Sequence, residues 1–129
     1  MKAIQNLPES ELEIMLVLWQ HTQPLRTSAI LEQVNQSKSW TLPTLKVLLG
    51  RLEQKGCVQC SREGRFALYQ AQVPQSAYRK KETKGVLQRF YQNNAKRMIA
   101  SLVNEEGLTQ ADLDEIAELI RKAGEKHAE

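Results

Sequence analysis

The segment from Thr41 to Gly56 constrains the fold more than any other part of the chain. Four leucines recur there at three- and four-residue spacing: Leu45, Leu48, Leu49 and Leu52. This spacing places them on one face of an α-helix, which must then be buried against a core. Thr41 is a good N-cap, Pro43 suits the first helical turn, and Gly56 favours a C-terminal stop. We therefore predict an amphipathic helix that begins after Thr41 and ends before Gly56.

Two shorter helices are predicted before this segment. Pro8 and the acidic residues that follow it mark a helix start, and helical spacing then relates Leu12, Met15, Leu16 and Trp19. This first helix is expected over residues 8–21. Pro24 ends it, and Thr27 or Ser28 can cap a second helix. The expected inner face of the second helix is Ile30, Leu31 and Val34.

A β-hairpin is predicted directly after the third helix. Residues 57–61 and 66–69 are extended in character, and residues 62–65 join them. Gly64 supplies the positive φ that a tight turn requires. Because a two-stranded ribbon is only marginally stable alone, it should lie against the helices. We expect it to do so through alternate side chains such as Val58, Phe66 and Leu68.

The order helix, helix, helix, hairpin is typical of a winged helix-turn-helix. In that fold the third helix enters the DNA major groove and the hairpin, or wing, reaches along the backbone. Pro74 marks a boundary. Beyond it we predict helices over residues 77–91, 95–103 and 109–123. The expected fold class is mainly α, with a winged-helix DNA-binding domain over residues 1–74 and a helical dimerisation region over residues 75–129.

The C-terminal helices carry more apolar residues than they can bury by themselves. Association with a second copy of the chain is the economical solution, and two-fold symmetric DNA sites favour it. The residues expected at this homodimer interface are Val86, Leu87, Phe90, Met98, Ile99, Leu102, Val103, Leu113, Ile116, Leu119 and Ile120.

Charge is distributed unevenly behind a net charge of +3. Residues 38–65 contain six basic and two acidic side chains, and residues 79–97 contain seven basic and one acidic. Residues 98–129 reverse the balance, with three basic and eight acidic side chains. Nucleic-acid binding depends on such local potential rather than on net charge. The pattern favours DNA binding, although a solvated charged surface would give the same counts.

The residues opposite the leucines of the third helix are the candidate readers of DNA. Thr44 can hydrogen-bond a base edge or a phosphate, whereas Val47 offers only apolar contact, as to a thymine methyl. Lys46 and Arg51 suit guanine or, more often, phosphate. Gly50 costs about 1 kcal/mol of helix propensity against Ala, which fits either a close backbone approach or a neutral surface position. The expected DNA-binding residues are Thr41, Pro43, Thr44, Lys46, Val47 and Arg51, with Arg62 and Arg65 beside the hairpin turn.

Other chemistry has little support in the sequence. The chain has no phosphate loop, no dinucleotide fingerprint and no arrangement of Ser, His and acid, so we expect no enzyme activity and no cofactor. The pair Cys57 and Cys60 has the spacing of a redox or zinc motif. Residues three apart on a strand point to opposite faces, which disfavours chelation. Structural cysteines, a thiol switch and a metal site stay open, and no bound metal is expected.

The composition is that of a globular protein, with 41% hydrophobic and 26% charged residues. No apolar run approaches the roughly 18 residues of a membrane span, and residues 1–4 lack a signal peptide's apolar core. We expect a cytoplasmic protein that does not associate with a membrane.

Three stretches carry a family resemblance: LP-x-SE-x-x-x-M-x-x-LW from Leu7, WT-x-x-TLK-x-LL-x-RL-x-x-KG from Trp40 and GR-x-x-x-Y from Gly64. Over residues 7 to about 122 the chain resembles the bacterial penicillinase-repressor family, which also contains copper-operon repressors. The resemblance implies a homodimeric transcriptional repressor that binds inverted-repeat operators. It also implies that Thr44, Lys46 and Arg51 contact DNA and that Arg65 is a wing contact.

The chain departs from this family at several positions. Val47 stands where many members have threonine, and Pro43 stands where a basic residue is common, so the preferred operator is expected to differ. Ser101-Leu102 aligns with the Asn–Phe bond that is cleaved in the penicillinase branch, and residues 124–129 lack the Cys-x-Cys motifs of the copper branch. Proteolysis, metal and thiol chemistry all stay open as inducing signals, and an inducer or sensor protein stays unidentified.

The sequence thus predicts a sequence-specific repressor that acts as a homodimer on double-stranded operator DNA. The alternative is a winged-helix protein-interaction module without specific DNA binding. Steep salt dependence of duplex binding would favour the repressor.

Overall fold

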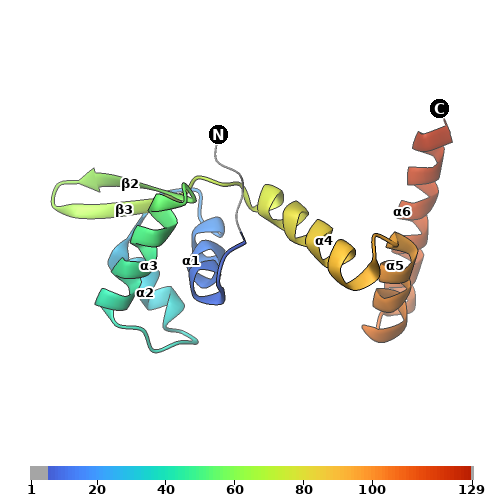
Figure 1. The fold of residues 1–129 in the computed structure, drawn as a ribbon, viewed down its shortest axis with the longest axis horizontal. Coiled ribbons are helices and arrows are strands. Elements are labelled where there is room, and N and C mark those ends of the chain that lie inside the picture. The colour runs from blue at the N-terminus through green and yellow to red at the C-terminus, as the bar shows by residue number, and fades with distance from the viewer. Residues whose placement is uncertain (1–5, 129) are drawn as a thin grey trace. The chain divides into compact units, whose positions relative to one another are not determined.

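The computed structural model describes residues 6–128 (Figure 1). Its elements are α1 (Glu9–Trp19), β1 (Leu25–Arg26), α2 (Thr27–Val34), α3 (Leu42–Gln54), β2 (Val58–Glu63), β3 (Phe66–Ala71), α4 (Gln75–Tyr91), α5 (Ala95–Glu105) and α6 (Gln110–Ala128). The three helices, the hairpin and the three later helices predicted from the sequence are all present. The mainly helical, winged helix-turn-helix fold class is confirmed.

The chain divides into two compact units, one through Glu82 and the other from Thr83, so that α4 contributes to both. The start of α4 packs with the first unit: the buried Tyr78 accepts a hydrogen bond from the Leu7 N–H at 3.1 Å. Domain limits of 1–74 and 75–129 stay a prediction. No helix within residues 6–128 has the length and apolarity to cross a membrane.

The hydrophobic core of the first unit lies between α1, α2, α3 and the sheet. Its buried residues are Ile14, Met15, Leu18, Ile30, Val34, Leu45, Leu48, Leu49, Leu52, Cys57 and Val58. The four leucines of the predicted stripe, Leu45, Leu48, Leu49 and Leu52, are all buried. Thr41 is the N-cap, and Gly56 adopts a φ of 77° just past the helix end. The leucine face is therefore committed to the core, and the opposite face of α3 remains exposed.

The apolar face predicted for α1 is wrong in part. The helix buries Glu11, Ile14, Met15 and Leu18. Of the four residues that the sequence favoured, only Met15 is buried, and Leu16 is 40% exposed. The buried residues do have helical spacing, but the first of them is Glu11. A search for periodic apolar residues does not count a buried carboxylate, so it does not find this face.

Glu11 is buried because Lys55 pairs with it. The Glu11 side chain is 2% exposed, and its Oε1 atom lies 2.5 Å from Lys55 Nζ. Lys55 is the C-cap residue of α3. A buried carboxylate without such a partner would be strongly destabilising. The ion pair therefore links the start of α1 to the end of α3.

The sheet has three strands in the order β1-β3-β2, all antiparallel, rather than the two predicted. Leu25 pairs with Tyr69, and Arg26 pairs with Leu68. Local sequence does not reveal β1, because two residues carry no periodicity and their partners lie far along the chain.

The hairpin turn is tighter than predicted. Glu63 pairs with Phe66, so that the strands are joined by Gly64 and Arg65 alone. Gly64 has a φ of 61°, as the sequence predicted for this position. In Figure 1 the hairpin of β2 and β3 extends beyond α1, α2 and α3.

This register corrects the predicted inner face of the hairpin. Val58 lies opposite Ala71 and is buried, so Tyr69 is on the same face of β3 as Ala71 and packs against the core. Phe66 and Leu68 were predicted to face inward, but they alternate with that face, and Phe66 is 44% exposed. Because two residues form the turn, even-numbered residues of β2 pair with odd-numbered residues of β3, so Val58 shares its face with Ala67, Tyr69 and Ala71 rather than with Phe66 and Leu68.

We expect Lys55→Met to lower the free energy of unfolding by about 3 kcal/mol, because it leaves the Glu11 carboxylate buried without a partner. The double variant Glu11→Leu/Lys55→Met should recover most of this loss, since two apolar side chains can replace a buried ion pair. Urea denaturation measures both. A Lys55→Met protein as stable as the parent would show that the pair does not hold α1 and α3 together.

Candidate nucleic-acid interface

The outward residues predicted on α3 are all exposed: Thr41, Pro43, Thr44, Lys46, Val47, Gly50 and Arg51. An α-helix turns about 100° per residue. Val47 and Gly50 therefore lie near the centre of the exposed face. Lys46 lies on one edge of this face, and Thr44 and Arg51 lie on the other. The structure thus presents an apolar centre between two polar edges.

The start of α3 is fixed by two sets of hydrogen bonds. Asn35 closes the turn between α2 and α3: its amide donates to the Trp40 carbonyl, and its Oδ1 accepts from the Trp40 N–H, both at 2.8 Å. The Thr41 Oγ1 atom accepts from the Thr44 N–H at 3.4 Å. These bonds determine where the first turn of α3 points.

The Thr44 hydroxyl is oriented by the same cap. Thr41 Oγ1 donates to Thr44 Oγ1 over 3.1 Å. Because a hydroxyl carries one donor and two acceptor sites, this bond occupies an acceptor site and leaves the Thr44 O–H able to donate. Phosphate oxygens and the acceptor atoms of base edges in the major groove are its natural partners.

A concave basic surface lies between α3 and the wing. It encloses about 360 Å³, and the residues that line it are Thr27, Lys46, Arg62, Arg65, Phe66, Ala67 and Tyr69. Lys46, Arg62 and Arg65 were predicted DNA contacts, and the structure brings them together here, whereas Arg51 lies on the other edge of α3. None of the described residues that line this basic hollow is acidic. Its chemistry suits an anion such as a DNA phosphate.

Four lining residues were not predicted. Ala67 and Tyr69 belong to the face of β3 that pairs with Val58, whereas the alternate residues Phe66 and Leu68 were predicted for the inner face. Thr27 follows β1, which the sequence did not reveal. Phe66 was assigned to the core instead.

Tyr69 contributes a neutral side chain to the basic hollow. Burial, and then a hydrogen bond with Cys60, raises the pKa of the Tyr69 phenol to about 12. The phenol therefore stays protonated near neutral pH. A phenolate in this hollow would carry a negative charge and would reduce the attraction of Lys46, Arg62 and Arg65 for phosphate.

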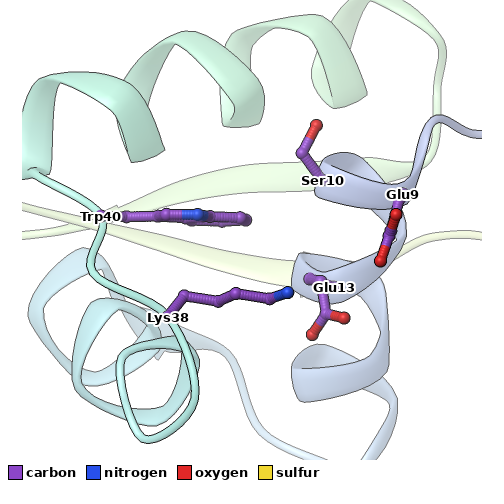
Figure 2. Close-up of a pocket in the computed structure, with 5 residues that line it drawn as sticks. All are labelled: Glu9, Ser10, Glu13, Lys38 and Trp40. Carbon is purple, nitrogen blue, oxygen red and sulfur yellow. The ribbon is translucent and has the colours of Figure 1, made fainter.

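A second hollow has the opposite chemistry (Figure 2). It encloses about 400 Å³ beside α1 and is lined by Glu9, Ser10, Glu13, Lys38 and Trp40. Figure 2 shows the Lys38 side chain extending toward Glu13, with the Trp40 indole beside it. Two carboxylates make this surface unsuited to phosphate. Trp40 is half-buried and packs against the core.

The two cysteines occupy different environments. Cys57 is part of the core, whereas Cys60 is half-buried on β2 beside Tyr69. Neither forms a disulfide. Cys57 thus packs as part of the core.

The exposed face of α3, with the basic wing next to it, defines a winged-helix DNA-binding protein. The family model described as Penicillinase repressor matches residues 7–122. The chain therefore belongs to the penicillinase repressor family, and it is a DNA-binding transcriptional repressor.

Similar proteins span nearly the same length. The penicillinase repressor of Bacillus licheniformis is 25% identical over 122 residues, which cover 95% of this chain and 94% of that protein. The methicillin resistance regulatory protein MecI of Staphylococcus aureus (strain N315) is 22% identical over 117 residues, covering 91% of this chain and 94% of MecI.

Two solved structures share the winged-helix part. The DNA-binding domain of the repressor BlaI has a TM-score of 0.53 with 31% identity, and the match covers 60% of this chain and 94% of that one. Monomeric Bacillus licheniformis BlaI in complex with the blaP half-operator has a TM-score of 0.51, with the same identity and coverage.

Gly50 gives a test of the exposed face. A Cβ added there would meet no atom within 4 Å, so the fold itself does not require glycine. We expect Gly50→Ala to raise the free energy of unfolding by about 0.5–1 kcal/mol. We also expect it to weaken duplex DNA binding, because the added methyl group projects from the centre of the face that approaches DNA. Urea denaturation and a fluorescence anisotropy titration measure the two effects.

Gly124 provides a matched control, since it is a second exposed helical glycine with open surroundings. Gly124→Ala should leave DNA affinity unchanged. Parental affinity in Gly50→Ala would identify Gly50 as a neutral surface residue.

Proposed function

We propose that this repressor acts as a homodimer that binds an inverted-repeat DNA operator with its two winged-helix units. The observation that carries the proposal is the convergence of Lys46, Arg62 and Arg65 on one hollow beside the exposed face of α3. Phosphate binding at this hollow would place α3 along the major groove and the wing over the adjacent backbone.

The position of each residue on α3 then determines whether it contacts phosphate or a base. Lys46 on one edge and Arg51 on the other neutralise phosphates on the two sides of the groove, which positions the helix without reading sequence. Thr44 donates its hydroxyl to a base edge, and Val47, which is 55% exposed, contacts a thymine methyl. Thr41 and Pro43 support this surface at the start of the helix. The half-operator complex of BlaI supports one winged-helix unit for each half of the operator.

The second unit supplies the reason for a dimer. No side chain among residues 83–127 is buried. The predicted interface residues are half-buried or exposed in the single chain, and Phe90 and Leu119 are 68% and 67% exposed. On α5 the apolar residues form one stripe, Met98, Ile99, Leu102 and Val103. On α6 they are Leu113, Ile116, Leu119 and Ile120. On α4 they are Val86, Leu87 and Phe90.

Apolar surface of this kind is stable in water when a partner covers it. A second copy of the chain is the partner that matches an inverted repeat, because a two-fold interface presents two winged helices with the same symmetry as the DNA. Linking two weakly binding modules raises their affinity through effective concentration. An occupied operator next to a promoter would then exclude RNA polymerase.

The operator itself is tested by selection from random duplex DNA at moderate salt, with the parent, Thr44→Val and Arg51→Ala in parallel. The parent should enrich an inverted repeat. Thr44→Val should relax the preference at one base pair of each half-site, by about 1–3 kcal/mol. Arg51→Ala should keep the preferred sequence, weaken binding to all sequences and reduce the salt slope by about one.

Failure of a folded parent protein to enrich any sequence would refute the proposed function. It would favour the protein-interaction module instead. Unchanged affinity and preference in both variants would show that α3 does not read the operator.

The dimer is tested by Ile99→Glu, which places a charge in the apolar stripe of α5. We expect this variant to sediment as a monomer and to lose operator affinity by a factor of about 10² or more, since the effective concentration of the second winged helix is lost. Analytical ultracentrifugation and the anisotropy titration measure the two effects.

Asn104→Glu is the matched control, because it adds the same charge to α5 at an exposed polar position. It should remain dimeric. An Ile99→Glu protein that stays dimeric would place the interface elsewhere.

A further inference from the structure

Arg26 is the last residue of β1, the short edge strand that pairs with β3. Its Cα partner on β3 is Leu68, and the first turn of α2 begins directly after it. The backbone of β1 therefore supports the hairpin only as far as Leu68. The part of the wing nearer the turn has no neighbouring strand on that side.

The Arg26 side chain extends this support toward the turn. Its guanidinium carbon lies 4.0 Å from the centroid of the Phe66 ring. Its Nη2 atom lies 3.6 Å from Glu63 Oε1. Glu63 and Phe66 are the final pair of the hairpin ladder before the turn. One side chain thus holds both strands at the point where the backbone pairing ends.

These contacts also separate the charges of the wing. Glu63 is the only acidic residue of the hairpin, residues 58–71. It alternates along β2 with Arg62, so the two side chains leave opposite faces of the strand. Arg62 lines the basic hollow, whereas Glu63 is held by Arg26 on the other face. Glu63 is not among the residues that line the hollow, although its cross-strand neighbour Phe66 is.

Stability of the fold does not explain the arrangement. The Arg26 and Glu63 side chains are 47% and 69% exposed, and ion pairs at such exposure contribute little to the free energy of unfolding. The planar guanidinium over an aromatic ring fixes direction as well as distance. Its effect is therefore on where the tip of the wing lies.

We propose that Arg26 is a positioning residue for the wing, which holds Arg62 and Arg65 beside Lys46 and acts on DNA through them. This inference rests on the proposed function, because it deepens the role of the same basic hollow. Arg26 itself does not line that hollow.

A double-mutant cycle separates positioning from direct contact. Arg26→Gln should weaken operator binding about tenfold in the parent background, a size typical of coupled neighbours. In the Arg62→Ala/Arg65→Ala background the same change should have no further effect, because the groups that Arg26 positions are gone. Equal losses in both backgrounds would overturn the proposal and make Arg26 a direct DNA contact. Parental affinity in Arg26→Gln would also overturn it.

Phe66→Leu tests the same contact without changing charge, and because Phe66 also lines the hollow, the combined variant with Arg26→Gln is the decisive one. Phe66→Leu removes the ring on which the guanidinium lies, so it should weaken binding as Arg26→Gln does. The two changes together should be no worse than either alone. Arg121→Gln is the matched control: it removes one positive charge and breaks exposed ion pairs with Glu118 and Glu125 on α6, and it should leave operator affinity unchanged.

Amide hydrogen exchange of the DNA-free protein gives a readout that is independent of the operator. Arg26→Gln should speed exchange in residues 62–67 and leave the core of α3 protected. If the parent protein binds no operator, the proposed function fails, and the exchange result still decides whether Arg26 orders the wing. Unchanged exchange at the wing would overturn the positioning role.

Discussion

The burial of the leucine face of α3 determines where every exposed residue of that helix lies. Four leucines on one side commit the helix to the core, and the buried pair of Glu11 and Lys55 links its last turn to α1. Asn35 closes the turn at its other end. A helix held at both ends cannot rotate, so Val47 and Gly50 stay at the centre of the exposed face. The reading surface is thus a consequence of packing on the opposite side of the same helix.

Electrostatics distinguishes the exposed surface that suits DNA phosphate from the one that does not. The hollow beside α3 combines three cations with a phenol that keeps its proton, whereas the hollow beside α1 has two carboxylates. Glu63 is the acidic residue of the wing, and it pairs with Arg26 and does not line the hollow. The net charge of +3 describes none of this. Local placement of a few side chains, rather than the total, makes one surface attractive to phosphate.

Much of the fold follows from local sequence signals. The leucine spacing, the Thr41 cap and the glycines at positions 56 and 64 predict α3 and the hairpin because each acts within a few residues. The errors share another cause. The face of α1 contains a charge that only Lys55 makes tolerable, and the strand β1 exists only through its pairing with β3. Partners so distant along the chain leave no periodicity near the residue itself.

The candidate site shows the same division between local and distant information. The exposure of the outward α3 residues could be predicted, because they lie on the opposite side of the helix from the leucine stripe. The convergence of Lys46 with Arg62 and Arg65 could not, since it depends on the hairpin register, and one residue of slip moves every side chain of β3 to the other face. The proposed role of Arg26 could not be predicted for a further reason. Its side chain contacts Phe66 and Glu63, which lie beyond the end of its own strand. Its contribution is a matter of geometry in the assembled sheet, and it emerges only when all three strands are in place.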